Sequence, residues 1–287
     1  MSAKSDRQRG LIAAVEAAGA VGFLMRDHLH KPKKMDHVEQ HDIKLELDVK
    51  SQQMIERVLA RHWPEAAVLG EEGVAGSPTA EWRWVIDPID GTVNYTYSIP
   101  HACISIALQQ RRAKASPTDI SDEAYETVVG VVYDPFSNEL WTAMLGGPAY
   151  LNGKKIKVST RAKLDEAIIS MGFSKNSDTL EEMLSRFNNL IRRVRKVRIM
   201  GAAALAMTYV ATGRFEAYWE GTIRLWDIAA GGLILECAGG EFWHESLGGD
   251  HTYRMIATNG LIRRKLVLAA GQLPPSRRAR AKTTSPK

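Results

Sequence analysis

The stretch WVIDPIDGTVNY, residues 84–95, decides how the rest of the chain is interpreted. Its start, 84–86, is a short apolar run typical of a buried strand, and the residues that follow at once, 87–92, are those of a turn. Proline confines Asp87 to an extended backbone, so its carboxylate is aimed differently from that of Asp90. Gly91 permits a close backbone approach, and a helix that begins there presents amides that favour a phosphate. The pattern indicates either a magnesium-dependent phosphoryl site or two aspartates that merely form a turn and a helix cap.

Two more acidic segments follow short apolar runs. The turn 70–73 contains Glu71 and comes after the run 66–69, where a solvated turn is the alternative interpretation. Asp227 follows Leu225-Trp226 and precedes a helix of small residues, a position where aspartate is a favoured N-cap. A cap and a metal ligand are compatible roles, because both need an oxygen exposed at a helix start.

Taken together, three segments resemble the signatures of the inositol monophosphatase family: GEE at 70–72, WVIDPIDGTVNY at 84–95 and WDIAAGG at 226–232. The family patterns WxxDPxDGTxN and WDxAAG are matched, and the resemblance extends from the first helix to about Gly271. It implies an α+β fold, a layered α-β-α-β-α sandwich of the inositol monophosphatase and fructose-1,6-bisphosphatase type. It also implies a cytoplasmic, homodimeric, lithium-sensitive phosphatase that uses Mg²⁺.

The resemblance carries roles onto particular residues. It implies two or three Mg²⁺ ions per site, bound by Glu71, Asp87, the Ile89 carbonyl, Asp90 and Asp227. Four carboxylates crowded together raise one another's pKa values, so cations are needed to keep them ionised. The catalytic residues it implies are Asp48, Thr92 and Glu71, with the first two orienting and deprotonating the attacking water. The substrate contacts it implies are Gly91, Thr92, Gly201, Ala202, Ala203, Glu220 and Asp227.

The chain departs from the family at two places. Where the family has VTxxD, residues 44–48 read KLELD, so the threonines are missing. Charged residues alternate with leucines there, so the alternative interpretation is that Asp48 shares the polar face of an edge strand with Lys44 and Glu46. If Asp48 is catalytic, Lys44 and Glu46 are candidates for supporting the site. The family turn Gly-Thr/Ser-Ala reads Gly201-Ala202-Ala203 here, which removes a hydroxyl, whereas Glu220 matches the glutamate that binds polyol hydroxyls.

The substrate interpretation therefore stays open within a class. The residues favour inositol monophosphate or a related polyol phosphate, and they leave myo-inositol itself in doubt. Relatives that hydrolyse histidinol phosphate, fructose 1,6-bisphosphate or the 2′- or 3′-phosphate of nucleotides are the alternatives. A different class, an RNA-associated regulatory protein, is the rival, because the tail contains SRRARAK. The tail lacks aromatic residues for base stacking, which argues against nucleic acid.

Composition sets the broad class. The 287 residues are 45% hydrophobic and 25% charged, as in a globular protein, and two cysteines fit a reducing cytoplasm. Five of the lysines and arginines fall in 274–287, and without them the net charge of +5 becomes zero, so a basic face over the whole body is not supported.

Residues 11–25 follow three basic residues, as in a signal peptide, but Glu16 favours an amphipathic helix. No run is long enough for a transmembrane helix.

Periodicity predicts the following organisation. We expect a first helix, a loop over 28–41, a helix over 51–62, and strands at 66–69, 82–86, 103–108 and 128–133, followed by hairpins over 139–158. The second half is expected to alternate strands at 168–171, 197–199, 215–219 and 254–257 with helices at 180–194, 202–212, 228–238 and 262–270. These elements predict an N-terminal subdomain at 1–150, a C-terminal subdomain at 151–273 and a disordered basic tail at 274–287.

Overall fold

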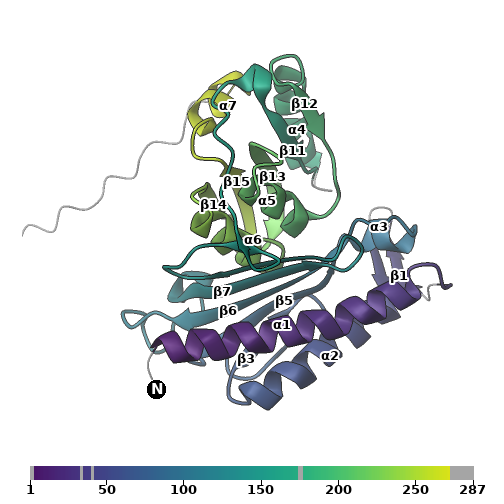
Figure 1. The fold of residues 1–287 in the computed structure, drawn as a ribbon, viewed down its shortest axis with the longest axis vertical. Coiled ribbons are helices and arrows are strands. Elements are labelled where there is room, and N and C mark those ends of the chain that lie inside the picture. Colours follow the sequence, from purple (N-terminus) through teal and green to yellow (C-terminus); the bar gives the residue numbers. More distant parts are fainter. Residues whose placement is uncertain (1–2, 33–34, 40–41, 174–176, 272–287) are drawn as a thin grey trace, which may run out of the picture.

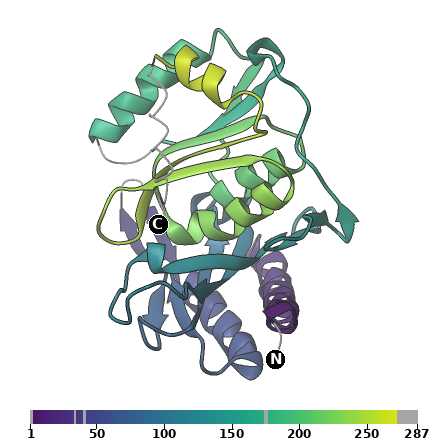
Figure 2. The same cartoon turned by 90° about the vertical axis from the view of Figure 1, so that its left-hand side faces the viewer.

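Five layers of helix and sheet alternate along the long axis of the molecule (Figure 1). The structure, a computed structural model, describes residues 3–32, 35–39, 42–173 and 177–271. Helices α1 (Ala3–His28) and α2 (Glu46–His62) cover the outer face of the first sheet, α5 (Ala203–Ala211) and α6 (Leu225–Cys237) lie between the sheets, and α4 (Ser177–Leu190) and α7 (Arg263–Ala269) cover the second sheet (Figure 2). The predicted α-β-α-β-α sandwich is therefore confirmed.

The first sheet has the order β10-β9-β8-β7-β6-β5-β3-β4. Its strands are β3 (Ala67–Gly70), β4 (Gly73–Ala75), β5 (Trp82–Asp90), β6 (Cys103–Arg111), β7 (Tyr125–Asp134), β8 (Glu139–Met144), β9 (Tyr150–Leu151) and β10 (Lys154–Lys155). All pair antiparallel except β3 with β5. Strand β5 is buried along its whole length, because Trp84 and Ile86 pack under α1 and α2 while Val85 packs under α6.

The second sheet has the order β12-β11-β13-β15-β14. Its strands are β11 (Ile168–Met171), β12 (Lys196–Arg198), β13 (Ala217–Arg224), β14 (Glu241–Ser246) and β15 (Thr252–Thr258). The first three are parallel, and β15 pairs antiparallel with both β13 and β14. The alanine-rich helices α5 and α6 fit between the two sheets because their small side chains permit close packing on both sides.

The first helix is amphipathic, as predicted. Ala14, Ala17, Val21 and Met25 form one buried stripe toward the sheet, while Glu16 on the exposed side bonds Arg61 and His62 of α2. None of the helices in the described ranges is both long enough and apolar enough to cross a membrane.

The stretch 28–48 differs from expectation. The predicted loop over 28–41 contains a strand, β1 (Met35–Glu39), which pairs antiparallel with β2 (Asp42–Leu45). Helix α2 begins at Glu46, five residues before the predicted start. The hairpin was not predicted because its strands are polar and show no regular apolar alternation. The helix start was misplaced because the acidic residues of its first turn resemble the polar face of a strand. Three short helical turns, α3 (Thr92–Thr96), η1 (Asp122–Ala124) and η2 (Leu164–Glu166), complete the chain.

Strands β9 and β10 belong to the first sheet. We therefore propose that the passage between the two subdomains lies after Lys155, a few residues beyond the predicted boundary at 150. The tail predicted to be disordered, 274–287, lies outside the described residues.

Candidate metal and phosphate site

Strand β5 ends in the two aspartates of the opening motif. The pairing of β5 with β6 is irregular between Asp87 and Asp90, where Pro88 has no N–H to donate. One carboxylate oxygen of Asp87 accepts the backbone N–H of Ile89 at 3.0 Å, and the Thr92 hydroxyl donates to the Ile89 carbonyl at 2.9 Å. These bonds turn the chain sharply and leave both aspartates at the end of a buried strand.

Asp90 is held by the start of helix α5. Its two carboxylate oxygens accept the N–H groups of Ala203, at 2.9 Å, and Ala204, at 2.8 Å, and the Cys103 thiol lies 3.4 Å from one of them. The positive end of a helix favours a carboxylate at this position. Asp90 therefore fixes β5 against α5 while remaining on the wall of a cavity.

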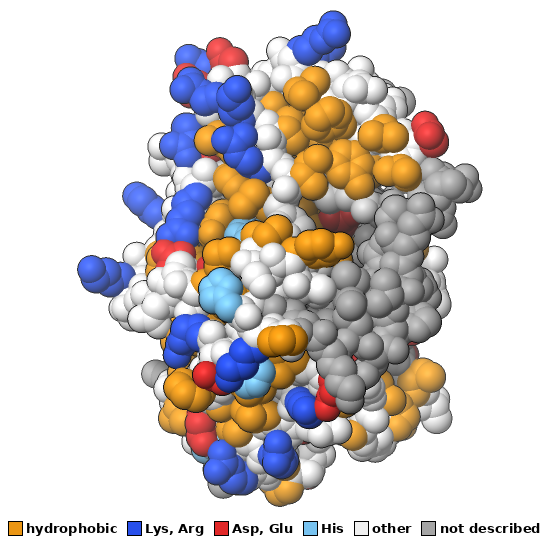
Figure 3. Space-filling view, turned by 90° about the vertical axis from the view of Figure 1, so that its right-hand side faces the viewer, with side chains coloured by type: hydrophobic (Ala, Val, Ile, Leu, Met, Phe, Trp, Pro, Cys, Tyr) orange, Lys and Arg blue, Asp and Glu red, His pale blue; other side chains and the backbone are white. Residues whose placement is uncertain are grey.

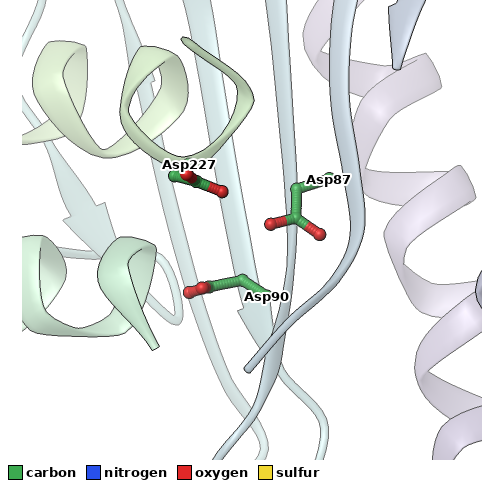
Figure 4. A group of neighbouring side chains, drawn as sticks. All are labelled: Asp87, Asp90 and Asp227. Atoms are coloured by element: carbon green, nitrogen blue, oxygen red, sulfur yellow. The ribbon is translucent and has the colours of Figure 1, made fainter. Parts of the chain in front are cut away.

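Asp227 lies in the first turn of α6 and accepts the N–H of Arg224 at 3.0 Å. Figure 4 shows Asp87, Asp90 and Asp227 around a common space, with the last coming from the helix. One oxygen from each lies within 4.8 Å of one from each of the others. Asp90 and Asp227 are 137 residues apart in the sequence, and the fold brings their segments together, as the matched motifs predict.

The three carboxylates lie in surroundings that disfavour their charged forms. Burial raises the pKa of Asp87, and the negative charges of Glu71, Asp90 and Asp227 raise it further. Burial likewise raises the pKa of Asp227, with Glu71 and Asp90 adding to it. Burial raises the pKa of Asp90 to about 6 against its backbone hydrogen bonds. A cation among the three would reverse these shifts.

Glu71 lies in the turn between β3 and β4 and lines the same cavity. Its N–H donates to the Ile86 carbonyl at 3.1 Å. Gln52 of α2 holds the turn from the other side, because its amide accepts from Glu72 at 2.9 Å and donates to Gly73 at 3.1 Å. A Cβ at Gly70 would lie 2.2 Å from this amide, so a side chain there would displace Gln52 from the turn.

Asp48 is buried in the first turn of α2, and is not on a strand. Its charge adds to burial in raising the pKa of Tyr95, which lies one turn beyond Thr92. The expectation that Glu46 shares a strand face with Asp48 is wrong, because successive helical positions point about 100° apart. Glu46 instead pairs with Lys50 at 2.6 Å along the helix. The side chain of Lys44 lies outside the described residues.

The cavity has a volume of about 880 Å³ and opens between the two sheets. Figure 3 shows acidic side chains inside a hollow that is partly rimmed by hydrophobic ones. The predicted site residues that line it are Glu71, Asp90, Gly201, Ala202, Ala203, Glu220 and Asp227. Asp48, Asp87, Ile89, Gly91 and Thr92 are not among the lining residues; all but Asp48 lie within three residues of Asp90 in the chain.

Two glycines bring the turn after β5 against the turn before α5. Gly91 has φ +93°, and a Cβ there would lie 3.0 Å from the His101 carbonyl and 3.2 Å from Ala202. Gly201 has φ +71°, again in the region that favours glycine. Asn94 joins the two turns, because its amide donates to the carbonyls of His101, at 3.0 Å, and Met200, at 2.9 Å. The quoted motif contained Asn94, but nothing in the sequence showed this role.

Glu220 stands on β13 at another wall of the cavity. It is 7% exposed, and it accepts the Tyr218 hydroxyl at 2.7 Å. Burial raises its pKa to about 7, although the bonds from Tyr218 and Gly221 oppose the shift. A Cβ at Gly172 would overlap its carboxylate at 1.4 Å, so the absence of a side chain there makes room for Glu220. Tyr218 and Gly172 were not found from the sequence, since neither belongs to a recognisable motif.

The layered fold and the buried carboxylate cluster define a class of metal-assisted phosphatases. A sequence model of the inositol monophosphatase family matches residues 6–273, and the chain belongs to this family, whose members hydrolyse phosphomonoesters. The chain is 34% identical over 279 residues to inositol monophosphatase 1 of Solanum lycopersicum, covering 94% of this chain and 97% of the relative. It is also 36% identical over 230 residues to the Nus factor SuhB of Xylella fastidiosa, covering 79% and 78%. Among solved structures, an inositol monophosphatase from Anabaena superposes with a TM-score of 0.75 at 33% identity, covering 94% and 98%.

Proposed function

We propose that this enzyme hydrolyses a polyol monophosphate, inositol monophosphate or a close analogue, with Mg²⁺ held by Glu71, Asp87, the Ile89 carbonyl, Asp90 and Asp227. The observation that carries the proposal is the position of Glu220 on the cavity that Asp90 and Asp227 also line. A metal site for the phosphate and an acceptor for hydroxyl groups thus face the same space.

The donor set fits Mg²⁺. The three converging groups offer carboxylate oxygens only, which is what this hard cation prefers. Burial raises all three pKa values, and repulsion from neighbouring carboxylates adds to this for Asp87 and Asp227, so bound cations would stabilise the ionised cluster. When bound, Mg²⁺ supplies the positive charge that neutralises a phosphate and lowers the pKa of water.

The chain's own residues then set the geometry. Asp90 is fixed in place by two backbone N–H groups, and Asp227 by one. We assign Asp48 and Thr92 to the attacking water, which they orient and deprotonate. The Thr92 hydroxyl donates its hydrogen bond to the Ile89 carbonyl, so its oxygen remains available to accept a hydrogen bond from the water. Glu71 shares in binding the metal and in this activation.

The charges on the cavity wall favour a single phosphate. The described bases that line it are Arg224 and His251, and both are already paired: Arg224 with Asp250 at 2.8 Å and His251 with Asp122 at 2.9 Å. A second phosphate would find no unpaired cation among these lining residues. A neutral polyol finds Glu220, whose carboxylate accepts hydroxyl hydrogen bonds.

The test is a panel of phosphate esters assayed with Mg²⁺ and again with excess chelator. The panel contains myo-inositol 1-phosphate, histidinol phosphate, fructose 1,6-bisphosphate and adenosine 3′,5′-bisphosphate. We expect the highest kcat/KM on the inositol or another polyol monophosphate, and loss of activity on chelation. A preference for either bisphosphate, or full activity in the chelator, would contradict the proposal.

Three further features of the proposal come from the family. We propose that the enzyme is a cytoplasmic homodimer and that millimolar lithium inhibits it. Light scattering of the purified chain measures the oligomeric state, and a lithium titration at saturating substrate measures the inhibition. A monomer at assay concentration would contradict the dimer.

A further inference from the structure

The three converging carboxylates are carried by two separate units. Asp87 and Asp90 stand at the end of β5 in the first sheet, whereas Asp227 stands at the start of α6, which follows β13 of the second sheet. A metal site tolerates only small changes in the distances between its ligands. Something must therefore hold β5 and the start of α6 at a fixed separation.

Asp122 lies between these two units, in the short turn η1 before β7. On one side, one carboxylate oxygen accepts from Arg83 of β5 at 2.8 Å. On the other, His251 Nδ1 lies 2.9 Å from both oxygens, and the Tyr253 hydroxyl donates to the second oxygen at 2.8 Å. The partners are 39, 129 and 131 residues away in sequence, and the side chains of Asp122 and Arg83 are only 10% and 7% exposed.

The Arg83 end of this connection is firmly anchored. Its guanidinium also donates to Gln109 of β6 at 2.7 Å and packs over the Tyr125 ring at 3.9 Å. Arg83 precedes Asp87 by four residues on the same buried strand. A displacement of Asp122 would therefore shift Arg83 and with it the strand that carries Asp87.

The His251 end reaches the start of α6. The His251 carbonyl accepts the N–H of Leu225, the first residue of the helix, at 3.0 Å. Arg224, whose own N–H bonds Asp227, also donates to Thr252 beside His251 at 2.8 Å. His251 has φ +51°, a conformation that residues with side chains seldom adopt, so its position depends on being held at both ring and carbonyl.

The charge on Asp122 suits this role. Burial alone would raise its pKa, but the hydrogen bond from His251, the charge of Arg83 and the Tyr253 hydroxyl outweigh burial and hold the pKa below its ordinary value. A buried carboxylate that keeps its charge makes stronger hydrogen bonds than a neutral group.

We propose that Asp122 is a positioning residue for the metal site, because it ties β5, with Asp87 and Asp90, to the start of α6, with Asp227, through Arg83 and His251. The inference rests on the metal site proposed above and adds to it a residue that touches neither metal nor substrate. Replacing outer residues that orient metal ligands typically weakens metal affinity by about 10- to 100-fold. A purely stabilising role would leave metal affinity unchanged.

The experiment measures Mn²⁺ binding to the full chain by titration calorimetry, without substrate, together with the melting temperature in chelator. We expect Asp122→Ala and His251→Ala to weaken Mn²⁺ binding by roughly 10- to 100-fold. Tyr253→Phe is the matched control on the same carboxylate, since it leaves Arg83 and His251 in place. Glu216→Gln is the control for a buried ion pair elsewhere, because Glu216 is fully buried and bonds Arg161 at 2.6 Å. Both controls should bind Mn²⁺ within about twofold of the parent.

Unchanged Mn²⁺ affinity in Asp122→Ala and His251→Ala, with a lowered melting temperature, would overturn the proposal. If Asp122→Ala does not fold, Asp122→Asn and His251→Ala are judged by the same criterion. Equal loss of affinity in Glu216→Gln would also overturn it, since general destabilisation would then be the cause. A parent that binds Mn²⁺ but hydrolyses no ester of the panel contradicts the proposed function and leaves this test valid. A parent that binds no Mn²⁺ overturns both.

Discussion

The two walls of the cavity are built in different ways. On the acidic wall, Asp90 and Asp227 line the cavity and Asp87 lies beside them, and all three accept backbone N–H groups at strand or helix ends. On the wall that carries Glu220, which we call the polyol wall, this carboxylate accepts from the Tyr218 side chain and from the main chain of Gly221, and it occupies the space beside Gly172. Main-chain bonds therefore hold every carboxylate of the first wall, whereas a side-chain hydroxyl and packing space contribute to the position of Glu220 on the second.

Under the proposed function, the first wall carries out the reaction and the second selects the substrate. Main-chain bonds at element ends persist whatever side chains surround them, so the acidic wall suits a reaction that every phosphate ester shares. Side-chain support changes with single substitutions, so the polyol wall suits the choice of alcohol. We therefore expect substitutions on the acidic wall to act mainly on kcat, and those on the polyol wall mainly on KM.

The largest effect is expected for Asp90→Asn. A neutral amide is a poor Mg²⁺ ligand, and losing several kcal/mol of charge stabilisation corresponds to a fall in kcat of about 10⁴-fold or more. Steady-state kinetics measure the fall, and circular dichroism checks the fold.

The matched control for Asp90 is Asp134→Asn. Asp134 is also a buried aspartate at a strand end, and it accepts the N–H groups of Phe136, at 2.8 Å, and Ser137, at 3.2 Å. It does not line the cavity. Activity near the parent's in Asp90→Asn, or an equal loss in Asp134→Asn, would remove Asp90 from the metal site.

Next in size is Asp48→Asn, which tests whether the acidic wall includes α2. If Asp48 deprotonates the water with Thr92, kcat should fall by roughly 10²- to 10⁴-fold with little change in KM. Glu46→Gln is the control, and the structure sharpens it, since Glu46 points away from Asp48 and pairs with Lys50. A larger loss for Glu46 than for Asp48 would reverse the assignment, and small losses for both would leave water activation to the metal.

The sequence predicted the acidic wall better than its surroundings. Asp87, Asp90 and Asp227 were found because their segments resemble family signatures, and they lie at the end of β5 and at the start of α6. The layered fold followed from the same motifs, and the strands β5, β6, β7 and β11 follow from their apolar runs. These features depend on local patterns that a single sequence displays.

The supporting contacts could not be predicted, because they join distant segments through ordinary residues. Gln52 looked like one polar residue of an amphipathic helix, and Asn94 like one residue of a motif. The start of α2 was misplaced because Glu46 and Asp48 alternate with leucines as residues of a strand do. Only the tertiary arrangement shows which distant segments Gln52 and Asn94 hold together.

A moderate effect is expected on the polyol wall. Glu220→Gln should raise KM for the polyol phosphate by roughly tenfold with kcat nearly unchanged, since a charge-assisted hydrogen bond contributes about 1.5–3 kcal/mol and the amide retains part of it. Tyr218→Phe should shift KM in the same direction by less. A small aryl phosphate without hydroxyls is the control substrate, and its KM should be unaffected by either change. A fall in kcat instead would mean that the two walls are not independent.

The smallest effect is a pH dependence of substrate binding. Burial raises the pKa of Glu220 to about 7, so the carboxyl is neutral below that pH and charged above it. The charged form accepts stronger hydrogen bonds from hydroxyls, so KM for the polyol phosphate should fall by a few-fold as the pH rises through 7. The sign for stability is opposite: between the ordinary value of 4.5 and about 7 the folded state holds a proton that the unfolded state has lost, so this group's contribution to stability decreases as pH rises. Because the substrate phosphate itself titrates near pH 6, the parent must be compared with Glu220→Gln. The difference between the two KM profiles isolates Glu220, and parallel profiles from pH 6 to 8 would show that its carboxylate does not contact the substrate.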